Sequence, residues 1–166
     1  MDSTKNHNHK KIHWPRLLMY ILGIIMAGSI SGLANVGNIQ TWYASLEKPI
    51  FNPPNSIFGP VWTLLYALMG LGLYMIWESP KSKGRNLALS LFFVQLILNF
   101  CWSFIFFYFH QPSWAALEIL VLWALILLMI NRFYKVNKWA AYLQIPYILW
   151  VSFASVLNIS IWWLNS

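Results

Sequence analysis

Charged side chains are scarce in this sequence of 166 residues, since Asp, Glu, Lys and Arg together make up only 9%. Soluble domains carry about 25% charged residues, so this chain cannot cover a water-facing surface. Apolar residues take their place, because 59% of the chain is hydrophobic and 18% is aromatic. The composition excludes a soluble globular domain and predicts a single-domain integral membrane protein, with the lipid bilayer as its solvent.

Residues with conventional catalytic chemistry are also few. The single cysteine, Cys101, excludes an intramolecular disulfide and leaves the redox compartment undetermined. The sequence has no glycine-rich phosphate loop, no His, Cys and Asp spacing typical of a metal site, and no Ser-His-Asp set. Hydrolytic and nucleotide chemistry therefore have no residues to support them, and we predict no metal site.

Long apolar runs are abundant instead. Each has close to the roughly 20 residues that a helix needs to cross the hydrocarbon core. We therefore predict an all-α integral membrane bundle of five transmembrane helices, forming one domain over residues 17–166, after a basic, disordered cytoplasmic tail at 1–16. The predicted spans are 17–36, 57–77, 87–109, 114–133 and 139–163.

The Lys and Arg residues lie almost entirely on one side of these spans. Only Lys48 falls in a connection on the other side. The positive-inside rule then places the N-terminus in the cytoplasm and the C-terminus outside. This distribution explains the net charge of +7 without a nucleic-acid partner. A bacterial plasma membrane is our preferred location, with a mitochondrial outer membrane as the alternative. The cations on the cytoplasmic side are Lys5, Lys10, Lys11, Arg16, Lys81, Lys83, Arg85, Arg132, Lys135 and Lys138.

Proline shapes the first connection and the fifth span. Pro49, Pro53 and Pro54 resist helix formation, so residues 37–56 are predicted to form a structured loop that acts as a lid. Asn55 or Ser56 would cap the following helix, with a further proline in its first turn. Pro146 should kink the fifth span, because it cannot donate the usual backbone hydrogen bond.

Aromatic and amide side chains repeat at helical spacing in three spans, all at the depth of the outer half of the bilayer. One interpretation is helix-packing contacts through buried amides. The other, which three such stripes beneath one lid favour, is a ligand cavity. The stripes are Trp62, Tyr66 and Met69; Gln95, Asn99, Trp102 and Phe106; and Tyr147, Trp150, Ala154 and Asn158.

Three further features lie within or at the ends of the spans, and the first of them is open to two interpretations. Glu118 is an acid inside a span, which indicates either a functional carboxylate or favourable placement near a helix N-terminus. Trp114 stands at a helix end and has the position of an interfacial anchor. Gly23, Gly28 and Gly32 form a small-residue stripe that predicts close helix contact.

The residue types in the predicted cavity suit a large, flat aromatic ligand. Amides of Asn99 and Asn158 would bind ring nitrogens or carbonyls, and Lys48 at the lid would bind a carboxylate. No span contains histidine, and His110 lies in a connection, so a haem iron would lack its ordinary axial ligand. A metal-free ring therefore fits better than haem, and we predict no permanent cofactor.

The segments WYASLEKPIFNPP, FGPVWTLLYALMG, LILNFCWSFIFF and PYILWVSFASVLN also carry a resemblance. In order and spacing they resemble the tryptophan-rich sensory protein family (TspO, translocator protein or peripheral benzodiazepine receptor family) over residues 17–163. The resemblance implies a five-helix bundle, often a homodimer, that binds porphyrins such as protoporphyrin IX. In bacterial members it implies a role in tetrapyrrole homeostasis and the stress response.

The resemblance further implies that some members degrade protoporphyrin IX in light and oxygen, using two pocket tryptophans that match Trp62 and Trp150. Animal members bind cholesterol through a stretch with Tyr and a basic residue, and Ser160 and Trp163 stand there in this sequence, so sterol binding is poorly supported. The family's other pocket positions match Trp42, Tyr43, Asn99, Trp102, Trp114 and Ala154.

Three functions follow as hypotheses. The first is a membrane receptor or sensor that binds protoporphyrin IX in an outer-half pocket, with light- and oxygen-dependent degradation as its only enzymatic activity. The second is a carrier that transports porphyrin or lipid without chemistry. The third is a structural or regulatory protein without a small-molecule ligand.

Overall fold

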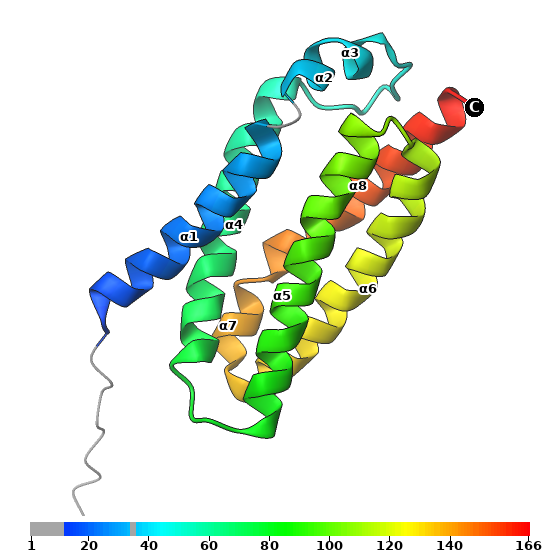
Figure 1. Cartoon of the computed structure of the whole chain (residues 1–166). Coiled ribbons are helices and arrows are strands. Elements are labelled where there is room, and N and C mark those ends of the chain that lie inside the picture. Colours follow the sequence, from blue (N-terminus) through cyan, green and yellow to red (C-terminus); the bar gives the residue numbers. More distant parts are fainter. Residues whose placement is uncertain (1–11, 34–35) are drawn as a thin grey trace, which may run out of the picture.

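The computed structural model describes residues 12–33 and 36–166, and every regular element in these ranges is helical (Figure 1). Five of the helical stretches are long and apolar enough to cross a membrane, which confirms the all-α bundle of five spans. The elements are α1 (Trp14–Leu33), α2 (Val36–Gln40), α3 (Trp42–Ser45), α4 (Asn55–Trp77), α5 (Lys83–Ser103), the π-helical η1 (Phe104–Tyr108), α6 (Pro112–Val136), α7 (Lys138–Tyr142) and α8 (Ile145–Leu164).

The spans form two groups. α1 packs along α4, while α6 packs along both α5 and α8 (Figure 1). The short helices α2 and α3 and the C-terminus lie at one end of the bundle, which we call the lid end. The α4–α5 and α6–α7 connections lie at the opposite end, which we call the basic end. The described cations near the basic end are Arg16, Lys81, Lys83, Arg85, Arg132, Lys135 and Lys138, whereas Lys48 lies at the lid end.

The first span begins earlier than predicted. α1 starts at Trp14, inside the region assigned to the tail, because Pro15 is tolerated in a first helical turn, where backbone N–H groups lack partners. The Leu17 amide already donates to the His13 carbonyl over 3.0 Å. The rest of the predicted tail, residues 1–11 with its lysines and two of its histidines, lies outside the described residues, as do residues 34–35.

The second span also differs in its first turns. Pro54 takes the N-cap position with extended backbone, and no side chain there accepts a capping hydrogen bond, so the predicted caps at Asn55 and Ser56 are wrong. Pro60 then falls in the second turn rather than the first. Because Pro54 has extended backbone, the helix starts at Asn55. A cap at Asn55 or Ser56 would have started the helix one or two residues later.

Arg85 fixes the junction between α4 and α5. Its guanidinium donates to the carbonyls of Ile76 and Trp77, with a shortest distance of 2.7 Å to Trp77. The Trp77 carbonyl ends α4, where carbonyls lack partners within the helix, so the cation satisfies it, while the Ile76 carbonyl also accepts from the Ser79 amide over 3.1 Å. Ser82 caps α5 by accepting from the Arg85 amide over 3.1 Å.

Pro146 breaks the fifth span instead of kinking it. α7 ends at Tyr142 and α8 begins at Ile145, with the proline in the first turn of α8. Gln144 lies buried in the break, where its side-chain nitrogen donates to the carbonyls of Leu68 and Ala140. Gly72 of α4 leaves the space for this amide, since a Cβ at that position would overlap it. The break therefore becomes a polar contact between α4 and the fifth span.

The small-residue stripe of α1 makes close contact at one of its three glycines. A Cβ on Gly28 would overlap the ring of Tyr66 on α4. Gly23 and Gly32 have no such neighbour within 4 Å, so the prediction of close packing is wrong for them. Gly70 of α4 meets the α1 backbone at Ile21, 2.6 Å from the position of a Cβ. The backbones of α1 and α4 therefore approach each other closely between Gly28 and the basic end of the bundle.

Candidate functional site

A cavity of about 420 Å³ lies between the two groups of spans, beneath α2 and α3. None of its described lining residues comes from α6 or α7, which pack away from it. The lining is Gly28, Ser29, Ser31, Gly32 and Leu33 of α1; Val36, Ile39 and Tyr43 of α2 and α3; Asn55, Phe58, Gly59, Trp62, Thr63 and Tyr66 of α4; Asn99, Trp102, Ser103, Phe106 and Phe107 of α5 and η1; and Trp150, Ala154, Leu157, Asn158 and Ile161 of α8.

Aromatic rings from three spans form most of the wall. Trp62 of α4 stacks on Tyr66, with ring centroids 5.4 Å apart. Trp102 of α5 stacks on Phe106 at 5.4 Å. Trp150 of α8 meets the edge of Phe58 at 5.8 Å. Each indole is therefore held by a neighbouring ring, and the cavity presents rigid aromatic surface to a ligand.

A chain of hydrogen bonds runs from the cavity wall into the core. The Tyr66 hydroxyl donates to Asn99 Oδ1 over 3.0 Å, and Asn99 Nδ2 donates to the Tyr147 hydroxyl over 3.2 Å. That hydroxyl donates in turn to Gln95 Oε1 over 2.8 Å. The chain joins α4, α5 and α8 through four buried side chains. In an apolar medium such bonds fix the register of the helices that they join.

Asn158 makes a second cross-link nearer the lid end. Its Oδ1 accepts from the Trp102 indole over 3.0 Å, and its Nδ2 donates to the Pro112 carbonyl over 2.9 Å. Both atoms of this amide are thus engaged by the protein. Asn99 is engaged to the same extent, so each of the two amides keeps one N–H and one lone pair for a ligand. The indole N–H of Trp150 is buried without a partner among the described residues.

The lid is bonded to itself and to the bundle. Tyr43 is 4% exposed, lines the cavity and donates from its hydroxyl to Asn52 Oδ1 over 2.8 Å. Burial raises the pKa of the Tyr43 phenol, so it stays neutral and remains a donor. Lys48 donates to the Leu46 carbonyl over 2.8 Å and lies 4.9 Å from the Tyr43 ring centre, outside the cavity lining.

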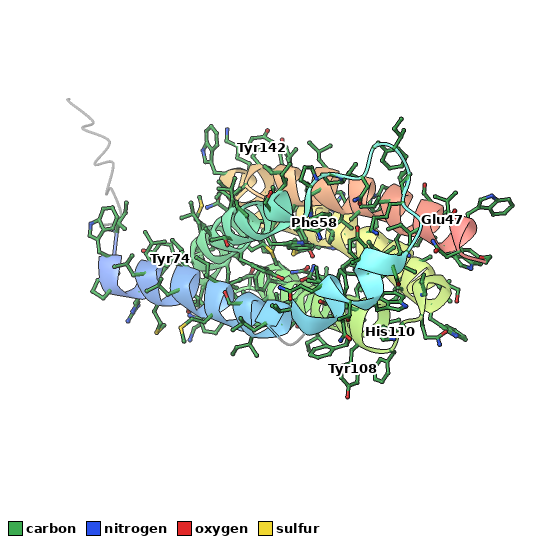
Figure 2. The ribbon with its side chains drawn as sticks, turned by 90° about the horizontal axis from the view of Figure 1, so that it is seen from above. Glu47, Phe58, Tyr74, Tyr108, His110 and Tyr142 are labelled. Atoms are coloured by element: carbon green, nitrogen blue, oxygen red, sulfur yellow. The ribbon has the colours of Figure 1, made fainter. Side chains whose placement is uncertain are left out.

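Hydrogen bonds and ring contacts hold the lid onto the spans. Glu47 and Asn165 form a reciprocal pair, in which the Glu47 amide donates to Asn165 Oδ1 over 3.0 Å and Asn165 Nδ2 donates to the Glu47 carbonyl over 2.9 Å. Figure 2 shows Glu47 beside the C-terminal end of α8. Trp42 stacks on His110 at 4.3 Å, next to the α5–α6 connection (Figure 2).

Eight of the eleven predicted ligand-binding residues line the cavity. Three do not. Trp114 is 64% exposed at the start of α6, Tyr147 is fully buried behind Trp62, and Trp42 lies in the lid between Phe106 and His110. The eight lining residues are Tyr43, Trp62, Tyr66, Asn99, Trp102, Phe106, Trp150 and Ala154.

Sequence analysis missed the contribution of α1. Gly28, Ser29, Ser31 and Gly32 form one side of the cavity, whereas the sequence predicts only close helix contact for the glycine stripe. Small residues carry no chemical signal of their own, although a small-residue stripe facing aromatic stripes could have indicated a space. Glu118 does not line the cavity, and both its carboxyl oxygens are buried without a hydrogen-bond partner.

Known proteins resemble this chain over nearly its whole length. The TspO/MBR family profile matches residues 20–164. The tryptophan-rich protein TspO of Archaeoglobus fulgidus is 40% identical over 151 residues, which cover 91% of this chain and 97% of that protein. The translocator protein of Bos taurus is 39% identical, covering 90% and 89% of the two chains. The tryptophan-rich sensory protein of Cereibacter sphaeroides is 32% identical, covering 75% and 77%.

Proposed function

Since the chain belongs to the TspO/MBR family, we propose that it is a membrane receptor that binds a tetrapyrrole of the protoporphyrin IX type in the cavity. The observation that carries this proposal is the convergence of Trp62, Trp102 and Trp150 from three spans on one space. Its volume of about 420 Å³ falls within the range of roughly 300–1,000 Å³ typical of small-molecule sites. Stacked indoles suit a large conjugated ring.

The preferred ligand is the metal-free ring rather than haem. The described lining residues include no His, Cys or Met, which are ordinary axial ligands of haem iron. The hydroxyls of Tyr43 and Tyr66 are engaged with Asn52 and Asn99. No group of three or more potential metal ligands occurs in the part of the chain that the structure describes.

Light- and oxygen-dependent degradation of the bound porphyrin is the finer part of the proposal. Trp62 and Trp150 would take part, because an indole is readily oxidised and both rings line the cavity. Such an activity would serve tetrapyrrole homeostasis or a stress response.

The orientation belongs to the same proposal. Seven of the eight described lysines and arginines lie near the basic end, and one lies at the lid end. The positive-inside rule then places the basic end in the cytoplasm and the cavity in the outer half of a bacterial plasma membrane.

Tryptophan fluorescence during a protoporphyrin IX titration, in the dark and under light, tests this proposal. We expect saturable quenching in the dark and loss of porphyrin absorbance only with light and oxygen. Trp150→Phe keeps an aromatic ring but removes the indole, so binding should change no more than about 10-fold while the absorbance loss stops. Trp14→Phe, at a 63% exposed position on α1, is the matched control and should behave like wild type.

A carrier function is the second candidate. Leu33 and Val36 line the cavity and are also 72% and 45% exposed, so the cavity reaches the outer surface between helices. A carrier predicts porphyrin flux across proteoliposomes with unchanged absorbance. Absence of saturable quenching would contradict both candidates and favour a structural or regulatory role.

A further inference from the structure

An exposed aromatic cluster lies at the basic end, where α6 turns into α7. The rings of Tyr134 and Tyr142 are 6.0 Å apart, and those of Trp139 and Tyr142 are 5.8 Å apart. These three side chains are 55%, 44% and 62% exposed in the order Tyr134, Tyr142 and Trp139. Figure 2 shows Tyr142 at the outer edge of the bundle. We call these rings, with Lys135 and Lys138, the α6–α7 corner.

The two lysines of the corner have no anionic partner. The Lys138 ammonium lies 5.6 Å from the Trp139 ring centre, and no described acceptor lies within hydrogen-bond distance of it or of Lys135. Of the described acids, Glu78 pairs with Arg16, while Glu47 lies at the lid end and Glu118 lies inside a span. The corner is therefore a cationic surface whose charge nothing in the described chain neutralises.

The α4–α5 turn, which also lies at the basic end, provides a comparison that shows what the rings of the corner add. Lys81 and Lys83 supply the same charge there and are also exposed. The indole near this turn, Trp77, is 42% exposed, and the cation over its ring, Arg85 at 5.4 Å, is engaged with helix-terminal carbonyls. The α6–α7 corner instead groups three exposed rings, and the cation over Trp139, Lys138, has no described hydrogen-bond acceptor.

We propose that the α6–α7 corner binds the headgroup of an anionic phospholipid. The ammonium groups of Lys135 and Lys138 would bind its phosphate. Tyr134, Trp139 and Tyr142 would contact the glycerol and upper acyl region, since amphipathic rings favour the depth of the membrane interface. The exposed rings favour a lipid over free phosphate, which offers them nothing apolar to contact.

Each cation near an anionic membrane surface contributes about 1 kcal/mol of attraction. Neutralising both lysines should therefore weaken binding of an anionic lipid roughly 30-fold, if both ammonium groups contact one headgroup. If the lysines acted only through the general surface potential, neutralising any two lysines at the basic end would weaken lipid binding by the same factor. The comparison between the two turns separates these cases.

The experiment uses the full chain in phosphatidylcholine nanodiscs with increasing phosphatidylglycerol. Lipid retention by native mass spectrometry and the midpoint of thermal unfolding are the readouts. We expect phosphatidylglycerol to raise the midpoint of wild type, Lys135→Gln/Lys138→Gln to lose most of this increase, and Lys81→Gln/Lys83→Gln to keep it. Trp139→Leu, which retains both charges, should also lose part of the retention.

Equal losses in the two double variants would overturn the proposal, because general electrostatic attraction would then explain the effect. No preference of wild type for phosphatidylglycerol over phosphatidylcholine would overturn it as well. Inorganic phosphate added to pure phosphatidylcholine nanodiscs should leave the midpoint unchanged. A shift with phosphate alone would instead assign the corner to a soluble anion.

Discussion

Removing the hydroxyl of Tyr147 tests how the wall behind the cavity is held together. This hydroxyl accepts from Asn99 Nδ2 and donates to Gln95 Oε1, and all three side chains are almost completely buried. Tyr147→Phe therefore breaks two hydrogen bonds and leaves two amide atoms unpartnered. Gln95 Nε2 already lacks a hydrogen-bond partner among the described residues, so the side chain of this glutamine would lose its last hydrogen bond there.

The magnitude follows from the environment of the two bonds. A buried polar group left unpaired costs about 1–3 kcal/mol in a soluble protein. Bonds between membrane helices average about 0.6 kcal/mol and reach about 1.7, because the separated helices find other partners. Two bonds lost at once should therefore lower the free energy of unfolding by about 1–3 kcal/mol. The Phe ring fills the same space, so no cavity adds to the cost.

Tyr66→Phe is the matched control, since it breaks only the bond from the Tyr66 hydroxyl to Asn99 Oδ1. It should cost about half as much as Tyr147→Phe. Reversible unfolding in mixed micelles, followed by tryptophan fluorescence, measures both values. If Tyr147→Phe proves no more destabilising than Tyr66→Phe, the two hydrogen bonds of Tyr147 do not hold the wall and the reasoning is refuted.

Three further substitutions probe other contacts. Gly28→Ala should destabilise by about 1–3 kcal/mol, because its Cβ overlaps the Tyr66 ring, whereas Gly32→Ala has free space and should be neutral or slightly stabilising in the same unfolding assay. Asn165→Ala removes both hydrogen bonds to the lid backbone, so hydrogen exchange over residues 41–52 should accelerate; unchanged exchange would mean that other contacts hold the lid. Glu118→Gln should raise stability at neutral pH, since it removes an acid without a described partner from a span, where a charge costs up to about 2.5–3.5 kcal/mol at the helix centre and less near an end; a loss of stability would reveal a partner for the carboxylate.

The sequence predicts the bundle well, because its signals are direct consequences of the bilayer. Five apolar runs and one-sided cations are required of any five-span protein, and they need no knowledge of side-chain packing. Helical spacing also brings Trp62, Trp102 and Trp150 to one space. Spacing fixes only the face of a helix, however. Tyr147 shares the face of Trp150 but lies one layer deeper, behind Trp62, which spacing alone does not distinguish.

The break in the fifth span could not be predicted from Pro146 alone. A proline inside an apolar run is compatible with a kinked helix or with two separate helices. In the structure two helices form, and the break brings Gln144 to an acceptor outside its own turn, the carbonyl of Leu68 on α4. That contact depends on Gly72, which lies 72 positions earlier in the chain. The deciding information is therefore a tertiary contact that no local pattern contains.

The same contacts hold the walls of the cavity in place. At the basic end, Arg85 joins α5 to the end of α4, and near the middle of α4 Gln144 of the fifth span donates to the Leu68 carbonyl. At the lid end, Asn165 ties the lid to α8, and between the two ends Tyr66 bonds across to Asn99. Closing the space would require breaking these bonds in a medium without water to replace them, which costs free energy for each polar group left unpaired. The aromatic walls are thus held apart by polar contacts at three levels, and a flat ligand meets surfaces that are already in place.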